Sequence, residues 1–256
     1  LRWAFQPVID GDIIPRKPLE AWESKVWNKV PIMTGFNSNE GTMYVDKTMS
    51  DASQFREFWH NLLPELSSSD LDTIEKLYPD PAVDPTSPYI EGRQGEGLGP
   101  QYKRIEAAYG HYAYVAPVRQ TAQFASSQGA PVYLYHWALP RTVVGRANHT
   151  DNMYYETYNS DITGISESQK ELSGTLHAYL TSFITTGDPN AVPGRYAQRP
   201  EWKPFQPAHK KIMIFGEGNE ELIGGNVAPP AKCVADDWAR EETEFWWSKV
   251  PISQLA

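Results

Sequence analysis

The chain has 256 residues, of which 40% are hydrophobic and 12% aromatic, and this is enough to bury a large core. No segment approaches the roughly 20 consecutive apolar residues that a membrane-spanning helix requires, so no membrane span is predicted. The formal net charge is −9 and the 23 lysines and arginines form no dense block, so the chain repels phosphate backbones and nucleic-acid binding is not expected.

The first third of the chain contains one hairpin pattern, one strand pattern and two helix patterns. Residues 1–15 hold two apolar pieces around Asp10-Gly11, a pair typical of tight turns, which predicts a β-hairpin. Residues 30–34 are an apolar run too short for a helix, which predicts a buried parallel strand. Across residues 51–77, apolar positions recur three and four apart with a break at Pro64, which predicts two amphipathic helices.

The remainder of the chain alternates between helix and strand patterns. Residues 78–100 are rich in proline and glycine, which indicates an extended surface connection. We predict helices over 101–126, 166–186 and 236–249, and strands over 131–137 and 211–215. This alternation indicates an α/β layered fold, but three strands make a poor sheet, so the chain is expected to be part of a larger fold.

Residues 31–41, reading PIMTGFNSNEG, form the most informative segment. An apolar run passes through a turn and presents Glu40 directly before Gly41. A buried strand that ends in a turn with a carboxylate at its tip is one way in which an α/β fold positions a catalytic acid. The alternative is that Glu40 caps a following helix or lies in solvent.

Several segments, taken in this order, resemble the type-B carboxylesterase and cholinesterase family of α/β-hydrolases. They are FQPVIDGDIIP, KVPIMTGFNSNEG, YVAPVRQTA, VYLYHW, GRANHTDNMYY, FITTGDPN and EWKPFQP. The resemblance implies that residues 1–256 are the C-terminal half of a single α/β-hydrolase domain. This half would hold part of a mostly parallel central sheet flanked by helices, with a helical region at about 51–128 over the active-site gorge.

Carried over to this sequence, the family pattern implies that Glu40 and His149 are the acid and the histidine of a Ser-Glu-His triad. The family has an acidic residue three positions after the histidine, whereas this chain has Asn152 there and Asp151 before it. The geometry of this loop is therefore expected to depart from the family pattern. Each of the other histidines lies in a strand, helix or polar-loop pattern that favours packing or surface roles: His60, His111, His136, His177 and His209.

The nucleophile of such a triad is missing from the sequence. The chain contains neither Gly-x-Ser-x-Gly nor a His-Gly-Gly-Gly stretch for an oxyanion hole. The family order is serine, acid, histidine, so the serine is expected in an N-terminal half, present either as a second polypeptide or as a preceding segment. This half is the expected partner of the chain.

The family also places an aromatic helical region beside the substrate. Phe55, Phe58 and Trp59 are therefore candidates for the substrate pocket, with core packing as the alternative reading of a helical aromatic stripe.

The resemblance predicts a carboxylic-ester hydrolase that forms an acyl-enzyme on a small-molecule ester. It needs no metal or organic cofactor, and the single cysteine, Cys233, cannot form a disulfide within the chain. A secreted, extracellular location is expected from the family. One alternative is a non-catalytic cholinesterase-like adhesion or binding module, and within hydrolases a lipase or a feruloyl-type esterase stays open.

Overall fold

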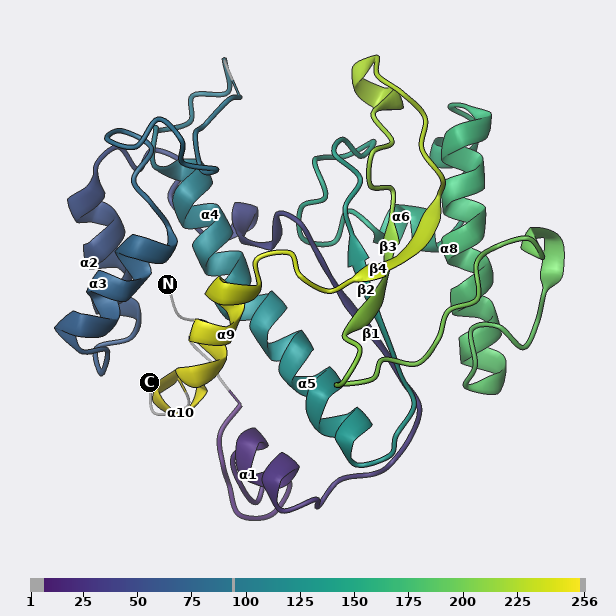
Figure 1. Cartoon of the computed structure of the whole chain (residues 1–256), viewed down its shortest axis with the longest axis horizontal. Helices are drawn as coiled ribbons and strands as arrows, with labels where there is room; N and C mark the ends of the chain where they lie inside the picture. The colour runs from purple at the N-terminus through teal and green to yellow at the C-terminus, as the bar shows by residue number, and fades with distance from the viewer. Residues whose placement is uncertain (1–6, 94, 254–256) are drawn as a thin grey trace. The chain divides into compact units, whose positions relative to one another are not determined.

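A computed structural model describes residues 7–93 and 95–253 of the chain (Figure 1). These residues form two compact units. The first comprises the described residues of 1–27, 41–117 and 239–256, and the second comprises 28–40 and 118–238. The chain therefore crosses between the units four times, once directly after Glu40.

The second unit contains a sheet in which the described strands lie in sequence order (Figure 1). They are β1 (Ile32–Asn37), β2 (Val132–Trp137), β3 (Lys211–Phe215) and β4 (Ala231–Ala235). The first three are parallel and β4 runs antiparallel to β3. The sheet is thus mixed and mostly parallel, as expected, and the three predicted strands are confirmed. β1 begins and ends two to three residues later than its apolar run predicts.

β4 was not predicted, because its sequence carries little strand signal. Only Ala231 of this strand is buried, and its remaining residues are half-buried or exposed. A short edge strand of this kind shows no regular alternation of apolar and polar side chains, so its pairing with β3 is visible only in the structure.

The register of β1 and β2 explains a glycine in the first strand. Gly35 lies opposite Tyr135, and a Cβ atom at Gly35 would be only 2.5 Å from the Tyr135 ring. The missing side chain at Gly35 leaves room for this ring, whose hydroxyl contacts Asn152 and Glu156.

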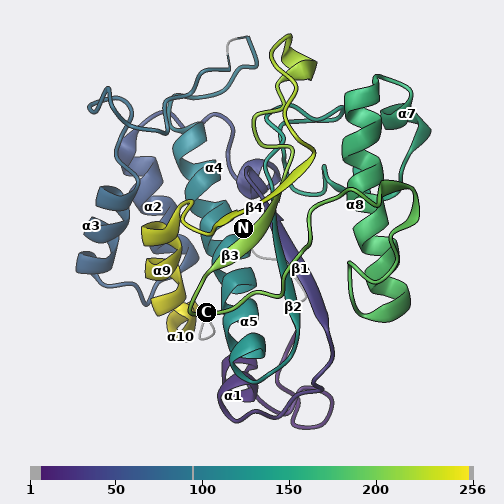
Figure 2. The ribbon, with the colours of Figure 1, turned by 45° about the vertical axis from the view of Figure 1, so that its right-hand side comes forward.

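Helices lie on both faces of the sheet (Figure 2). On one face, α8 (Glu167–Thr186) begins at Ser166, whose side chain accepts the Gln169 N–H, and ends at Gly187, whose φ is 78°. It packs on the short helices α6 (Met153–Glu156) and α7 (Ser160–Thr163). On the other face lies α5 (Ala116–Ser127). The core under α8 includes Trp137, Tyr155, Leu172, Leu176, Tyr179, Trp202, Met213 and Phe215. Two 3₁₀ turns, η3 (Gly194–Tyr196) and η4 (Glu221–Ile223), complete the unit.

In the first unit, the two helices predicted over 51–77 are confirmed as α2 (Ala52–Leu62) and α3 (Ser68–Leu77). Each begins with a capping box, in which the N-cap side chain accepts the backbone N–H of the third helical residue and the side chain of that residue accepts the backbone N–H of the N-cap. The pairs are Asp51 with Gln54 and Ser67 with Asp70. Figure 2 shows these helices packed side by side.

The other helices of the first unit include a departure from the predicted pattern. They are α1 (Pro18–Glu23), α4 (Tyr102–Gly110), α9 (Arg240–Ser248) and α10 (Val250–Ser253). The helix predicted over 101–126 contains a π-helical segment, η2 (His111–Val115), between α4 and α5. The helix predicted over 236–249 begins only at Arg240.

The predicted hairpin at residues 1–15 is wrong within its described part. Residues 7–15 contain no strand, and the Asp10 side chain instead accepts the backbone N–H groups of Asp12 and Ile14 at 2.9 Å each. This aspartate turn competes with hairpin pairing. Residues 1–6 of the predicted hairpin lie outside the described part.

The core of the first unit is aromatic. Trp246 Nε1 donates to Tyr78 Oη at 2.9 Å, and that hydroxyl lies 2.9 Å from His111 Nδ1. Phe55 and Trp59 are fully buried in the same core, and Phe58 packs against it partly buried. This burial favours the packing interpretation of the three aromatic residues, and their assignment to a substrate pocket stays a prediction.

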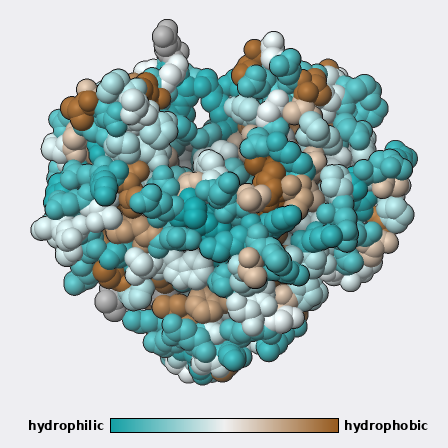
Figure 3. Space-filling view, viewed as in Figure 1, coloured by the Kyte–Doolittle hydropathy of each residue, from teal (hydrophilic) through white to brown (hydrophobic). Residues whose placement is uncertain are grey.

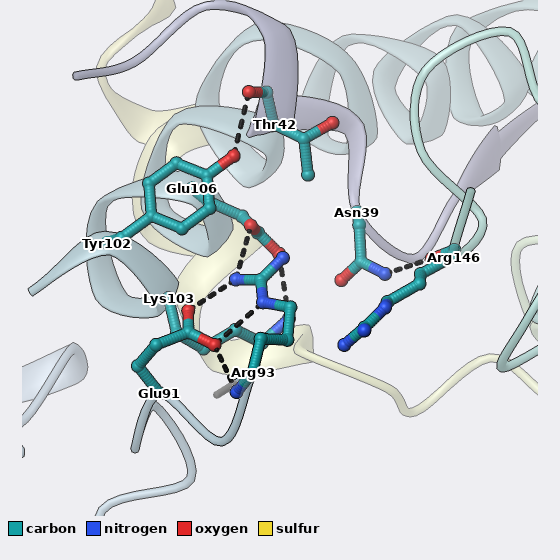
Figure 4. A network of polar contacts seen from close by, with 8 residues as sticks. All are labelled: Asn39, Thr42, Glu91, Arg93, Tyr102, Lys103, Glu106 and Arg146. Carbon is teal, nitrogen blue, oxygen red and sulfur yellow. Dashed lines mark hydrogen bonds and ion pairs between the residues drawn. The ribbon is translucent and has the colours of Figure 1, made fainter. Parts of the chain in front are cut away.

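A buried charge cluster lies beside this core (Figure 4). Arg93 donates to Glu91 and to the fully buried Glu106, and Lys103 also contacts Glu106. A Cβ atom at Gly41 would overlap the backbone carbonyl of Glu106, so only glycine fits at this position.

Within residues 7–93 and 95–253, no helix combines the length and the apolar composition that crossing a bilayer requires. On the face in Figure 3, hydrophilic residues cover most of the area and hydrophobic ones form small separate patches.

Candidate active site

Glu40 lies just past the end of β1. The chain turns after Asn37 into a short 3₁₀ helix, η1 (Glu40–Met43), of which Glu40 is the first residue. The Asn37 backbone N–H donates to Glu40 Oε1 at 2.7 Å, and the side chain folds back onto the strand end with a relative exposure of only 6% for the residue. The turn therefore fixes the direction of the carboxylate.

His149 lies on the loop between β2 and α6, and backbone pairing brings this loop to the Glu40 turn. Past the strand ends, the Asn39 N–H donates to the Ala147 carbonyl at 3.0 Å, and Asn39 and Asn148 form a parallel β-bridge. The Asn39 side chain also donates to the Arg146 carbonyl (Figure 4). Because residues 39 and 148 are paired, the residues that follow them, Glu40 and His149, are neighbours.

The two side chains meet directly. His149 Nδ1 lies 2.6 Å from Glu40 Oε2, while the other carboxylate oxygen accepts the Asn37 N–H. Burial raises the pKa of Glu40, and the Asn37 N–H and the hydrogen bond and charge of His149 partly oppose that rise. The His149 side chain is 27% exposed, against 7% for Glu40, so the histidine is the more accessible member of the pair.

Asp151, whose role the sequence left open, closes the histidine loop. Its Oδ2 accepts the Thr142 hydroxyl at 2.8 Å and the Asn148 N–H at 3.0 Å, while the Thr142 hydroxyl accepts the Gly145 N–H at 2.7 Å. Burial raises the pKa of Asp151, and the Thr142 hydroxyl is the main opposing group.

The backbone on either side of His149 is in the left-handed region. Ala147 has φ 53° and Thr150 has φ 73°. For a β-branched residue such as threonine this conformation is strained, and it persists only where surrounding contacts enforce it. The Asp151 contacts supply that enforcement.

Asn37 and Asn152 join the two loops, a role that the sequence did not reveal. Asn37 Nδ2 donates to the Asn148 carbonyl at 2.6 Å and to Asn152 Oδ1 at 3.0 Å. Asn152 Nδ2 in turn donates to Glu156 Oε1 at 2.5 Å and to Tyr135 Oη at 3.2 Å. Asn152 occupies the position where the family pattern has an acid, and the carboxyl nearby belongs instead to the half-buried Glu156, one helical turn further on.

His136 lies at the same end of the sheet and has a different environment. It is 2% exposed, its Nε2 is 2.8 Å from the Ser38 hydroxyl, and its ring packs against those of Phe36 and Trp238. Burial, with a smaller effect from the Arg119 charge, lowers the pKa of His136 to about 3, so this ring stays neutral. The packing interpretation of His136 agrees with this environment.

In the described part of the chain, no three or more His, Cys, Asp or Glu side chains gather in a group that could hold a metal ion. Cys233 is exposed on β4.

A mostly parallel sheet covered by helices, with a buried carboxylate after one strand and a histidine after the next, is the architecture of an α/β-hydrolase. The chain belongs to the carboxylesterase family, whose family model matches residues 2–246. The resemblance and the fold class predicted from the sequence are thus confirmed.

Among known proteins, the chain is 32% identical to Secreted lipase 4 of Gibberella zeae over 250 residues, which cover 96% of this chain and 41% of that protein. It is 24% identical to human Neuroligin-2 over 272 residues, covering 97% of this chain and 31% of that protein. The solved structure of Aspergillus niger EstA shares the fold, with a TM-score of 0.74 at 20% identity, over 98% of this chain and 46% of EstA. The chain therefore spans less than half the length of each.

Proposed function

We propose that the chain supplies the acid and the base of a serine carboxylic-ester hydrolase. The observation that carries this proposal is the 2.6 Å contact between Glu40 Oε2 and His149 Nδ1, made by a carboxylate whose second oxygen is already bound to a backbone N–H. A carboxylate held in this way keeps the imidazole in one orientation and one tautomer, with the proton on Nδ1.

The reaction follows from that tautomer. With Nδ1–H donated to Glu40, Nε2 of His149 accepts the proton of a serine hydroxyl as the serine attacks the ester carbonyl. The protonated imidazole then passes this proton to the leaving alcohol, and an acyl-enzyme remains. Water, activated by the same nitrogen, releases the acid. Glu40 stabilises the transient imidazolium throughout.

The serine and the oxyanion hole are proposed to lie outside residues 1–256. Neither motif occurs in this sequence, and the chain covers 41% of the lipase and 46% of EstA. The partner of this chain is then the part of the enzyme that carries the nucleophile, joined to it as a preceding segment or bound as a second polypeptide.

The substrate is proposed to be a small-molecule carboxylic ester, with Phe55, Phe58 and Trp59 still candidates for its pocket. The name Secreted lipase 4 favours triglycerides and long acyl chains as the first esters to test, and favours a secreted location. Initial rates on p-nitrophenyl esters of increasing chain length, with methyl ferulate alongside, separate lipase, short-chain esterase and feruloyl esterase.

Covalent labelling tests the proposal. The complete native enzyme is treated with a fluorophosphonate, which reacts with activated serines, and the labelled peptide is located by mass spectrometry. The expected result is one labelled serine outside residues 1–256, with labelling abolished in His149→Ala. A labelled serine within these residues would contradict the placement of the nucleophile. Absence of any label would contradict the serine mechanism itself.

A further inference from the structure

We propose that Glu156 is a positioning residue for the catalytic pair, acting through the amides of Asn152 and Asn37 to hold the His149 loop on the Glu40 turn. This inference deepens the proposed function and rests on it. Neither the composition nor the spacing of the sequence indicates a role for these residues, and the inference comes from one continuous set of contacts.

The contacts run from the end of α6 to the catalytic carboxylate. Glu156 Oε1 accepts Asn152 Nδ2, Asn152 Oδ1 accepts Asn37 Nδ2, and the Asn37 backbone N–H donates to Glu40 Oε1. Asn37 is 2% exposed and Glu40 6% exposed, so water has little access to the catalytic end of this set. The contact between Asn37 and Glu40 is therefore strengthened by the low local dielectric.

Glu156 decides which way the Asn152 amide faces. An amide has a donor side and an acceptor side, and a carboxylate only accepts. With Glu156 on one side, Asn152 must turn its Nδ2 toward it and its Oδ1 toward Asn37. The reverse orientation would set two oxygens against each other at Glu156 and two NH₂ groups against each other at Asn37.

The orientation of Asn152 is passed on to Asn37. Asn37 Nδ2 has two acceptors, Asn152 Oδ1 at 3.0 Å and the Asn148 carbonyl at 2.6 Å. Asn148 is the residue directly before His149. A flipped Asn37 amide would lose both contacts. Asn37 thus ties the end of the acid-bearing strand to the histidine loop, and Glu156 is the group that fixes its direction.

Tyr135 completes the surroundings of Glu156. Its hydroxyl accepts Asn152 Nδ2 at 3.2 Å and lies 3.4 Å from Glu156 Oε1 as a donor. Burial raises the pKa of Glu156, with the Asn152 and Tyr135 hydrogen bonds opposing the rise. The carboxyl is therefore held by neutral donors and has no cationic partner among the contacts described, which suits a role in orienting amides.

Exchanging the carboxyl group of Glu156 with the amide group of Asn152 tests the proposal. In the complete enzyme, Asn152→Asp sets two carboxyl groups against each other and removes the donor to Glu156, so kcat is expected to fall about 10- to 100-fold. The double variant N152D/E156Q places the carboxylate at 152, where it still accepts from Asn37, and the amide at 156, where it donates. Recovery to within about threefold of wild-type kcat is expected.

Two further variants keep the proposal falsifiable. Glu156→Leu is expected to lower kcat about 10- to 100-fold with KM changed less than about threefold, because orientation of the base is lost and substrate binding is not. Glu156→Gln can turn its NH₂ group toward Asn152 and so no longer fixes the direction of that amide. Its kcat is expected to fall by less than that of Glu156→Leu, because one orientation of the glutamine still accepts from Asn152. Glu167→Gln, on a glutamate whose side chain is 89% exposed, is the matched control.

The outcomes are distinguishable. A purely structural role would lower the melting temperature of Glu156→Leu and leave kcat per folded molecule unchanged, and that result would overturn the proposal. Failure of N152D/E156Q to improve on Asn152→Asp would overturn it as well. The imidazole N–H proton resonance of His149, which reports its bond to Glu40, is expected to shift in Glu156→Leu. If His149→Ala retained activity, the proposed function would fail on grounds that do not involve Glu156.

Discussion

Asn39 and Asn148 form a parallel β-bridge beyond the ends of β1 and β2, one residue before Glu40 and His149 respectively. Backbone pairing that continues past the sheet thus sets the spacing of Glu40 and His149, whose side chains meet at 2.6 Å. The proposed acid and base are positioned by the same parallel pairing that builds the fold.

Glu40→Gln tests the role of the carboxylate. The amide keeps the size of the side chain but can present its NH₂ group to Nδ1, which favours the wrong tautomer of His149. We expect kcat to fall by about 10³- to 10⁴-fold with a small change in KM. The exposed Glu167→Gln serves as control, and a loss below about tenfold in Glu40→Gln would argue against a triad acid.

The raised pKa of Glu40 predicts how stability depends on pH. A carboxyl group whose pKa is higher in the folded state binds more protons folded than unfolded, so the free energy of unfolding falls as the pH rises from its unfolded value, near 4.5, through its folded value. Asp151 and Glu156, whose pKa values are also raised by burial, act in the same direction.

Glu40→Gln removes one of these titrations. Urea unfolding of both proteins between pH 4 and 8 is expected to show a smaller decline with pH in the variant. An unchanged or steeper decline would show that Glu40 is not destabilised by burial.

Gly41→Ala tests the close approach of the backbone directly after the acid. The added methyl group would overlap the carbonyl of Glu106, and relief requires a backbone shift. We expect a loss of about 1–3 kcal/mol in the free energy of unfolding. Gly92→Ala is the matched control, since a Cβ at Gly92 meets no atom within 4 Å and its φ is not positive. Equal effects of the two substitutions would refute this account.

A buried ion pair in the second unit is expected to matter for stability. Arg119 Nε lies 3.1 Å from both carboxylate oxygens of Asp236, and Arg119 Nη2 donates to the Trp238 carbonyl at 2.7 Å. Asp236→Ala leaves the guanidinium buried without its carboxylate, so a loss of about 3–5 kcal/mol is expected in chemical denaturation.

The control for that prediction is an exposed pair. Lys203 and Glu201 are 3.7 Å apart with side chains 72% and 69% exposed, so Glu201→Ala should cost less than about 1 kcal/mol. Similar losses at Asp236 and Glu201 would contradict the importance assigned to burial.

The central strands and the facing of Glu40 and His149 were predictable from sequence for a physical reason. β2 and β3 are short runs of buried β-branched and aromatic residues. β1 and β2 are parallel neighbours that end at the same edge of the sheet, so groups on the segments that follow these two strands come together. Family motifs then selected Glu40 and His149 from the other carboxylates and histidines.

The remaining parts of the site depend on contacts that local patterns do not encode. The Asn37 and Asn152 amides meet across 115 positions of sequence, and the register of β1 with β2 and the strained loop around His149 bring them together. Asparagine is common in turns, where its side chain hydrogen-bonds the local backbone, so an asparagine in a turn pattern does not by itself indicate a longer-range contact. Glu156 resembles any carboxylate at a helix end until its contact with Asn152 is seen.

The most direct test of the catalytic pair is the kcat/KM of His149→Ala in the complete enzyme, measured on the best p-nitrophenyl ester with folding checked by circular dichroism. A loss of at least about 10³-fold with an unchanged spectrum is expected, because the base that activates the serine is removed. A loss below tenfold in a folded variant would contradict the assignment of His149 and, with it, the hydrolase mechanism proposed for this chain.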